Sequence, residues 1–527
     1  MTSSQPFATP TSSEMLQDAQ KNLTTVDSTA SIDLLTATIE EVQQHLTSGT
    51  ITSVQLCKTY LARIEANNRK GLELRAVMET PPVDDLLAIA RSHDEMRNQG
   101  TLLGKLHGIP LPVKDNIGTD PKLGMKTTAG SYALLNSIPV EDSTVIAKLR
   151  AAGAIILGKT TMCELGHYRT SAVINPCHGW SSRGGQGRSA YVAGGCPEAN
   201  PGGSSSGSAI AVSAGFAPAA LGTDTIGSLI APAGRAAEYT LRSTVGLISR
   251  YGVVPASRHL DTVGPIAKSV CDAAILLECM SGYDPKDPAT VAAQLHTPKE
   301  YTKFTKMPHA TFRGKRLGVP RIGIFDADLW GNTDWRDAKV KPALDAAIRK
   351  MEALGASICD PADLPSYKQW KASMRTDQWE VVRHGLKEGL AEYLSGMQST
   401  DVHSLRGIIE LKLFRMGYDY RSQPGSGITT GPRTRPVERI CGADGIEKLL
   451  EEHHLDALVT PNNEMAWCYA AFGGAVAAVP LGVHENGEPF GFCFLGRKWS
   501  EPMLVSLMAA YEANFAPRAV PTALKHD

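Results

Sequence analysis

The order of helical and strand-like segments constrains the fold of this chain more than any other feature of its sequence. Apolar residues recur at helical spacing over residues 39–46, and residues 84–99 and 143–152 also have the pattern of helices. Short apolar runs typical of strands occur at 154–157 (AIIL) and 455–461 (LDALVTP). Because helices that alternate with strands are typical of α/β proteins, we expect an α/β fold with a mixed sheet.

The domain organisation is read from shifts in composition along the chain. Residues 1–31 are polar and predict a flexible N-terminal tail, followed by one domain over residues 32–527. Between about residues 328 and 439 the pattern becomes more helical, which indicates a variable insert rather than a second domain. The insert contains four tryptophans, Trp330, Trp335, Trp370 and Trp379.

Composition and charge argue against several classes of function. The formal net charge of -1 argues against a general nucleic-acid binder. No apolar run reaches the roughly 18 residues that a membrane-spanning helix needs, and the N-terminus lacks a signal-peptide pattern. The ten cysteines show no C-x-x-C pair and no Cys/His ligand spacing. We therefore expect mostly buried thiols in a reducing compartment and a cytoplasmic location.

Residues 153–160 (GAIILGKT) match the P-loop pattern G-x-x-x-x-G-K-T. In a P-loop the four variable residues form a loop after a strand, and their amides hold phosphate. Here AIIL is itself the strand candidate and follows a predicted helix, so the order of elements is wrong. Since no G-x-G-x-x-G follows a predicted strand either, we expect no nucleotide or dinucleotide cofactor.

A glycine- and serine-rich stretch, PGGSSSGSAI at residues 201–210, points to a site rather than a linker. It continues into small apolar residues, which a flexible linker does not need. GTDTIGS at 222–228 offers another serine, and Lys114 ends an apolar run. Burial lowers the pKa of a lysine from its usual value of about 10.4, so that it can act as a general base. A buried lysine is also commonly a salt-bridged structural residue, so the lysine alone leaves both roles open.

Three segments together resemble the amidase signature family: GGSSSGS at 202–208, GTDTIGS at 222–228 and VKDN at 113–116. The resemblance extends from about residue 34 to residue 511 and is weakest over the insert. NPCHGWSSRGG and GSLIAPAGRAA are similar to the fungal and peptide-amidase-like branch. The resemblance implies an amidase signature fold, with helices on both faces of a mixed central sheet. It also implies an amidohydrolase that acts on linear amides without a cofactor or a metal.

The same resemblance assigns roles to residues at matching positions. Ser228 is the expected nucleophile, Lys114 the base, and Ser204 the proton carrier between them, preceded by a cis peptide bond. The backbone amides expected to form the oxyanion hole are those of Thr225, Ile226, Gly227 and Ser228. The residues expected to support the site are Ser205 and Asp224.

Two positions depart from the family pattern. Ile226 stands where many members have glycine, and its β-branched side chain restricts the backbone of the oxyanion-hole turn. Ile230 stands where many members have an arginine that pairs with Asp224. Because an unpaired buried carboxylate is costly, we expect Asp224 to have another partner or to lie in solvent. We expect activity to persist with altered specificity.

Three functions remain open from the sequence. The first is a stand-alone amidase that hydrolyses a small carboxamide through an acyl-enzyme, a mechanism that also admits esters. The alternatives are a glutaminase subunit of a tRNA-dependent amidotransferase and a catalytically impaired small-molecule binder. The expected partner is a small-molecule amide, with no nucleic acid and no membrane segment, and a homodimer is one alternative for the assembly. Specificity is expected to depend on the insert and on Glu164, Gly166, His167, Tyr168 and Asn462.

Overall fold

The computed structural model describes residues 32–168, 177–196, 199–322, 339–373, 377–416 and 434–525. The predicted tail at 1–31 lies outside these ranges, and so do Trp330 and Trp335 of the predicted insert. The side chain of Trp379 also lies outside the description.

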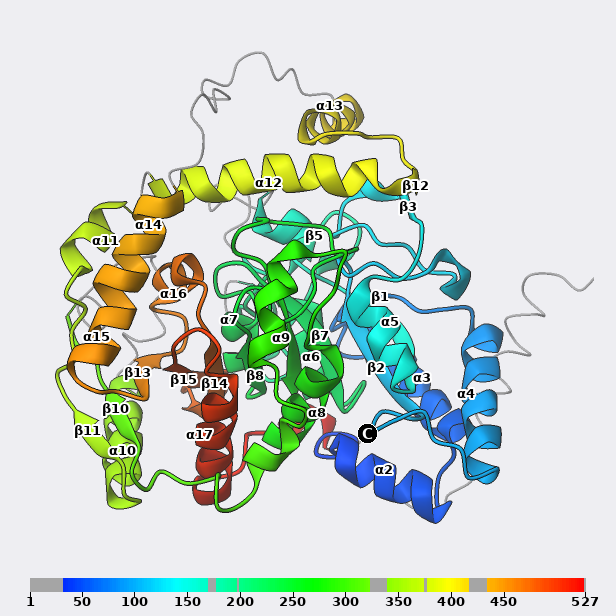
Figure 1. Ribbon diagram of the computed structural model, residues 1–527. Helices are drawn as coiled ribbons and strands as arrows, with labels where there is room; N and C mark the ends of the chain where they lie inside the picture. The colour runs from blue at the N-terminus through cyan, green and yellow to red at the C-terminus, as the bar shows by residue number, and fades with distance from the viewer. Residues whose placement is uncertain are drawn as a thin grey trace, which may run out of the picture.

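A mixed sheet of eleven strands forms the centre of the described structure (Figure 1). In spatial order the strands are β1 (Val77–Glu79), β4 (Ala154–Thr160), β2 (Ile109–Lys114), β7 (Ala219–Asp224), β9 (Thr262–Ala267), β8 (Tyr239–Arg242), β14 (Val476–Val483), β15 (Pro489–Leu495), β13 (Ala457–Pro461), β10 (Arg316–Gly318) and β11 (Ser357–Cys359). The groups β4–β2–β7 and β13–β10–β11 are parallel, whereas the pairs between them are antiparallel. The mixed sheet is confirmed; the predicted run AIIL falls in β4, and β13 covers the last five residues of LDALVTP, Ala457–Pro461.

The helices follow the apolar spacing of the sequence. They are α2 (Ile39–Ser48), α3 (Ser53–Asn67), α4 (Val83–Asn98), α5 (Thr144–Ala151), α6 (Ser206–Ser213), α7 (Ile230–Gly234), α8 (Val270–Met280), α9 (Ala293–His296), α10 (Val340–Ala353), α11 (Tyr367–Ser373), α12 (Asp377–Ser395), α13 (Leu405–Met416), α14 (Thr434–Cys441), α15 (Glu447–Glu452), α16 (Ala466–Phe472) and α17 (Glu501–Asn514). Two short ladders pair β3 (Ile138–Pro139) with β12 (Met397–Ser399) and β5 (Trp180–Ser181) with β6 (Gly185–Gln186). The three helices expected near the N-terminus are confirmed as α2, α4 and α5.

Side chains of successive strand residues pack on opposite faces of the sheet, because a strand has a period of two. In β7, Ala219 and Leu221 join an apolar cluster that includes residues of α8 and α17. Ala220, between them, packs instead with residues of α6 and α7. Both faces are therefore covered by helices, as the resemblance implied.

The segment expected as a helical insert, 328–439, contains α10 to α13 and most of α14. The long helix α12 crosses the top of the molecule in Figure 1, and α13 lies above it. The segment also supplies β11, which pairs with β10 at the edge of the central sheet. Trp370 of α11 is fully buried and packs beside α14 and α16 residues in one apolar cluster. The helical content agrees with the prediction, while β11 ties part of the segment to the sheet.

Two expectations from composition can be compared with the described residues. None of their helices combines the length and apolar character needed to cross a membrane. Five of the eight free cysteines are buried, as expected for small apolar side chains. Cys177 and Cys196, however, form a disulfide with a Cα–Cα distance of 5.9 Å, so the expectation of thiols does not hold for this pair.

Candidate active site

The central sheet brings the predicted base and the nucleophile turn to one edge. Lys114 is the last residue of β2, and Asp224 is the last residue of β7. The two strands are parallel neighbours, with Val113 opposite Leu221. Since the carboxyl ends of parallel strands meet at the same edge, Lys114 lies beside the turn that carries Ser228.

The ammonium group of Lys114 contacts hydroxyl and carbonyl oxygens only. Its Nζ lies within hydrogen-bond distance of four oxygens: Ser204 Oγ at 2.9 Å, Ser205 Oγ at 2.9 Å, and Oγ1 and O of Thr223 at 2.8 and 3.1 Å. Burial lowers the pKa of Lys114 to about 7, although nearby acidic groups partly offset this effect. Among the described residues no carboxylate forms an ion pair with Lys114. The contacts therefore argue against a salt-bridged structural lysine.

Two other buried lysines show that a lowered pKa alone does not mark a catalytic base. Burial lowers the pKa of Lys268 to about 7, but its Nζ donates to the carbonyl of Leu34 at 2.5 Å. Burial also lowers the pKa of Lys159 to about 8, and its Nζ donates to Thr127 Oγ1 at 2.9 Å and to the carbonyl of Ile117. Lys159 belongs to the P-loop-like segment, which is strand β4 after helix α5. The rejection of a P-loop is confirmed.

The glycine- and serine-rich stretch forms the loop that leads into α6. The peptide bond between Gly203 and Ser204 is cis, as the resemblance implied. Ser205 Oγ donates to the Thr223 carbonyl at 3.0 Å and also accepts from Lys114, so it holds the loop against the end of β7. Ser206 Oγ donates to the carbonyl of Gly202 at 2.5 Å. The hydroxyls after Ser204 therefore fix the loop around the lysine.

Ser228 lies in a turn whose backbone is fixed from two sides. Its carbonyl accepts from the amide of Ser205 at 3.2 Å. This bond joins the turn that carries Ser228, called the nucleophile turn, to the serine loop at residues 201–210. Gly227 has a φ of +86°, and a Cβ at this position would lie 1.9 Å from Asn463 Oδ1. The left-handed conformation therefore falls on glycine, and the neighbouring Ile226 does not have to adopt it.

The amides of this turn divide into two groups. The amide of Gly227, expected to face the oxyanion, instead donates to Asp224 Oδ1 at 2.9 Å. Within the described part of the chain, the amides of Ile226 and Ser228 donate to no protein group. Thr225 is anchored through its side chain, which donates to Asp261 Oδ1 at 2.6 Å. The amides of Thr225, Ile226 and Ser228 thus remain the candidate oxyanion donors.

The carboxylate of Asp224 forms an ion pair with Arg242, a partner that was not predicted from the sequence. Arg242 Nε donates to Asp224 Oδ1 at 3.0 Å, and both side chains are fully buried. The other Asp224 oxygen accepts from the amide of Leu229 at 2.8 Å. The guanidinium of Arg242 also donates to the carbonyls of Leu260 and Gly474, at 2.8 and 3.1 Å. The predicted alternative of another partner is therefore confirmed, and Asp224 does not lie in solvent.

The residues of the loop that was expected to set specificity are held in place by contacts with other segments of the protein. Glu164 is buried, and its carboxylate accepts from the Ser182 amide at 2.8 Å. Tyr168 Oη lies 2.9 Å from the carbonyl oxygens of both Ala256 and Val382, either of which can accept its proton, and so joins this loop to α12. Gly166 (φ +68°) packs near Ala256, and Asn462 packs against Gly234. His167 lies beside Cys163 and His178, although the sequence showed no Cys/His ligand spacing.

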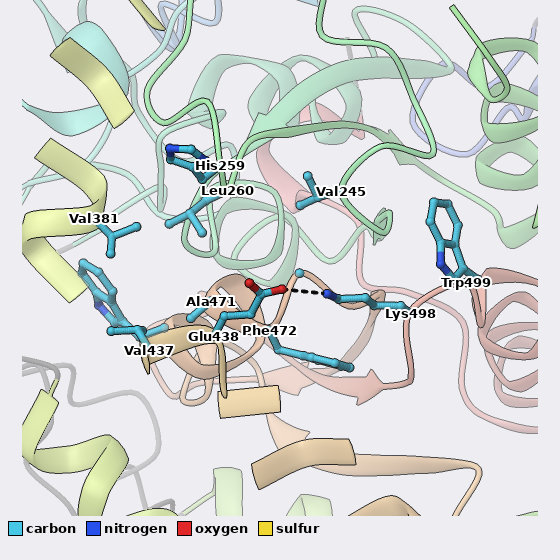
Figure 2. A pocket seen from close by; sticks show the side chains of 12 residues that line it. Val245, His259, Leu260, Val381, Val437, Glu438, Ala471, Phe472, Lys498 and Trp499 are labelled. Atoms are coloured by element: carbon cyan, nitrogen blue, oxygen red, sulfur yellow. Dashed lines mark hydrogen bonds and ion pairs between the residues drawn. The ribbon is translucent and has the colours of Figure 1, made fainter. Parts of the chain in front are cut away.

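A pocket of about 310 Å³ was not foreseen from the sequence (Figure 2). Its walls combine apolar side chains with Glu438 and Lys498, which form an ion pair at 3.1 Å. Ile226 packs against the same apolar cluster as the pocket residues Leu260 and Trp467. The nucleophile turn and the pocket therefore share a cluster of side chains, contributed by segments far apart in the sequence.

Comparison with known proteins identifies the family of this chain. Residues 55–378 match the model of the Amidase family. A protein of Arabidopsis thaliana described as a "Probable amidase" is 35% identical over 490 residues, covering 90% of this chain and 89% of that protein. A glutamyl-tRNA(Gln) amidotransferase subunit of Anaeromyxobacter dehalogenans is 30% identical, covering 94% of this chain and 99% of that protein. The native peptide amidase from Stenotrophomonas maltophilia is 34% identical with a TM-score of 0.80, covering 92% of this chain and 98% of that one. The chain therefore belongs to the amidase family and is an amidohydrolase.

Proposed function

We propose that this amidase hydrolyses the C–N bond of a small carboxamide through Ser228, with Lys114 as the base and Ser204 as the proton carrier. The observation that carries the proposal is the 2.9 Å hydrogen-bond distance between Lys114 Nζ and Ser204 Oγ, across which neutral Lys114 can accept the serine proton. Because burial lowers the pKa of Lys114 to about 7, a large share of the lysine is neutral and able to accept a proton at neutral pH. The two other buried lysines contact no serine hydroxyl among the described residues.

The proposed acylation conserves protons within the site. Ser228 Oγ bonds to the carbonyl carbon as its proton passes to Ser204, whose own proton passes to Lys114. Collapse of the tetrahedral intermediate breaks the C–N bond, and the proton returns from Lys114 through Ser204 to the leaving nitrogen. A water molecule then attacks the acyl ester by the same relay, releasing the carboxylic acid and restoring Ser228.

The developing negative charge needs donors that are not already occupied. We assign this role to the amides of Ile226 and Ser228, with Thr225 as the third candidate. Asp224 orients the turn because it accepts from the amides of Gly227 and Leu229 on either side of Ser228. Arg242 in turn balances the charge of Asp224 away from the reacting atoms.

The alternative functions have less support. A catalytically impaired binder is disfavoured because neither departure from the family pattern removes part of the site. Asp224 pairs with Arg242 instead of an arginine at position 230, and the left-handed conformation falls on Gly227 rather than on Ile226. A glutaminase subunit would use the same residues but would depend on partner chains. Amide hydrolysis by the isolated chain separates this alternative from the stand-alone amidase.

A fluorophosphonate probe tests the relay without knowledge of the substrate, because it reacts with an activated serine. We expect peptide mass spectrometry to locate the adduct on Ser228 and to find it lost in Lys114→Ala and Ser204→Ala. Ser213→Ala, which removes a buried hydroxyl of α6 outside the relay, is the matched control and keeps the label. An adduct on another serine, or full labelling of Lys114→Ala, would contradict the proposed mechanism.

The compartment and the assembly of the enzyme can each be tested by one measurement. We propose a cytoplasmic enzyme with a small-molecule amide as its partner, although the Cys177–Cys196 disulfide is unusual for that compartment. Thiol titration of protein purified under native conditions distinguishes a disulfide from two free thiols. Light scattering after size exclusion decides between a monomer and a homodimer.

A further inference from the structure

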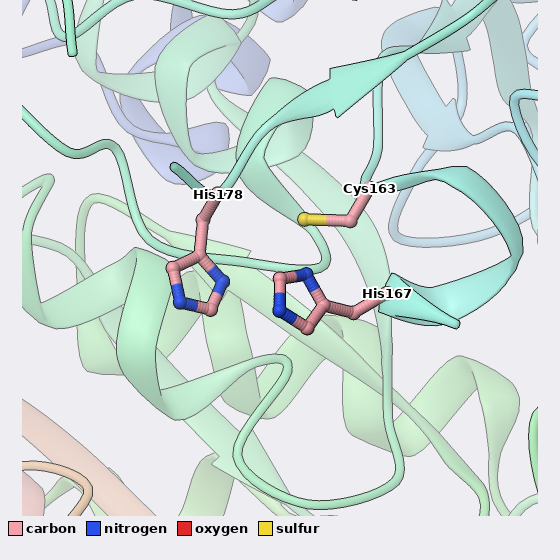
Figure 3. Close-up of side chains that lie close together, drawn as sticks. All are labelled: Cys163, His167 and His178. Atoms are coloured by element: carbon pink, nitrogen blue, oxygen red, sulfur yellow. The ribbon is translucent and has the colours of Figure 1, made fainter. Parts of the chain in front are cut away.

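We propose that Cys163, His167 and His178 form a binding site for a divalent transition metal of the zinc class, placed against the catalytic serine loop. The three side chains point toward one another, with Cys163 and His167 in one short segment and His178 in a later one (Figure 3). One ligand atom from each residue lies within 4.8 Å of the other two. A thiolate and two imidazoles are ligands that zinc prefers.

The three residues of the cluster differ in how far they are buried. Cys163 is buried, while His167 and His178 are half-buried. The imidazoles of His167 and His178 are stacked, with ring centroids 4.6 Å apart and an interplanar angle of 9°. Zinc bonds of about 2.3 Å to sulfur and about 2.0–2.1 Å to nitrogen place tetrahedral ligands roughly 3.6 Å apart. The rings must therefore tilt out of their stack and move inward by about 1 Å to bind the ion.

The contacts around the cluster leave its ligand atoms able to bind a metal ion. His178 Nδ1 is buried and has no hydrogen-bond partner among the described residues. Because an unsatisfied buried nitrogen is costly, a cation at this position would remove a penalty that the protein otherwise carries. Cys163 Sγ accepts from the amide of Gly179 at 3.0 Å, a contact that supports the negative charge of a thiolate.

The position of the cluster connects it to the reaction. The amide of Cys163 donates to the carbonyl of Ser204 at 3.2 Å. A Cβ added to Gly203 would lie 2.5 Å from Cys163 Sγ and 3.1 Å from His178 Nδ1. A metal ion at this point would fix the loop that carries Ser204 and restrict the access of Ser204 to the reacting groups. We therefore expect bound metal to lower amidase activity. This consequence rests on the proposed function, whereas the binding of metal does not.

Binding is measured by titrating the full chain with Co²⁺, followed by displacement with Zn²⁺, in buffer without thiol reductants. We expect one equivalent of Co²⁺ to give a thiolate-to-metal charge-transfer band that is absent in Cys163→Ser. His178→Ala is expected to weaken binding more than about 100-fold, since it removes a ligand rather than an outer partner. Cys279→Ser and His309→Ala, which lie outside the cluster, are the matched controls and keep the band.

Circular dichroism identifies any variant that fails to fold, and His167→Gln then provides a second test of the same site. A charge-transfer band that persists in Cys163→Ser, or no binding by the folded wild-type chain, would overturn the metal site.

The effect on the reaction is measured as the rate of fluorophosphonate labelling with and without Zn²⁺. We expect Zn²⁺ to slow labelling of the wild-type chain at least tenfold and to leave the rate of Cys163→Ser the same in both conditions. Unchanged labelling of a metal-loaded wild-type chain would refute the inhibitory role. If no serine is labelled in any sample while the Co²⁺ band is present, the proposed function fails and the metal site stands.

Discussion

The buried ion pair between Asp224 and Arg242 gives the sharpest prediction about how the site is held together. Both side chains are fully buried, and the carboxylate accepts from two turn amides in addition to the guanidinium. Arg242→Met keeps most of the side-chain volume but leaves a buried carboxylate without a cation. Removing one partner of such a pair costs about 3–5 kcal/mol. We expect the free energy of unfolding to fall by that amount.

An exposed pair of the same type provides the control. Arg406 and Glu410 are paired at 2.8 Å on α13, and their side chains are 87% and 62% exposed. Arg406→Met is therefore expected to cost no more than about 0.5 kcal/mol. Urea unfolding followed by tryptophan fluorescence measures both changes under the same conditions.

A double variant separates the loss of the ion pair from the cost of an unpaired buried charge. Asp224→Asn in the Arg242→Met background removes the unpaired charge, so it should recover part of the lost stability even though each single change is destabilising. Recovered stability need not restore fluorophosphonate labelling, because Asn offers only one oxygen to the two turn amides. A cost for Arg242→Met as small as that for Arg406→Met would refute the view that this pair supports the nucleophile turn.

Three more predictions concern the reaction itself. Since only neutral Lys114 accepts a proton and its pKa is lowered to about 7, labelling of Ser228 should rise about tenfold per pH unit below pH 7 and level off above it; a flat profile between pH 5 and pH 8 would contradict this. Gly227→Ala should slow labelling by about 100-fold, because the new Cβ would collide with Asn463 and displace the turn; a wild-type rate would show that the turn is not fixed there. Ile226→Gly should widen the space beside the cluster shared with the pocket and raise kcat/KM for bulkier amides relative to small ones; an unchanged substrate profile would refute that role.

The residues proposed as catalytic could be named from the sequence because each lies in a short contiguous segment that resembles the amidase signature. Lys114, Ser204 and Ser228 each sit in a run whose small or apolar neighbours are visible in the sequence. The environment that gives Lys114 its lowered pKa follows from burial at the end of β2, which the apolar run before it indicated.

Arg242 could not be assigned in the same way. It ends β8, which is separated from β7 by β9 in the sheet, so its contact with Asp224 depends on strand order that the sequence does not specify. The one available signal was a charged residue at the end of the short run EYTLR, where a fully buried strand requires a partner for the charge.

The pocket and the Cys/His cluster were missed for a related reason. Cys163 and His167 are four positions apart, but His178 comes from a later segment, and only the fold brings it to them. The pocket is lined from the loop after β8, from α12, α14 and α16, and from residues before α17. Sites assembled from several distant segments depend on tertiary packing, and here no resemblance to a known family joined the segments in advance, as it did for Lys114, Ser204 and Ser228.

The hydroxyl of Tyr168 has a consequence for how this enzyme can diverge. The two acceptors within its reach are main-chain carbonyls, those of Ala256 and Val382, so the contact depends on the path of the backbone and not on any side chain of α12. Exposed residues of that helix can therefore be substituted, in evolution or by design, without loss of the hydrogen bond that holds the loop of His167. The backbone of α12 supports the loop, while the exposed side chains of the helix are free to vary. Replacing α12 with the same helix of a relative should preserve the loop as long as the backbone follows the same course.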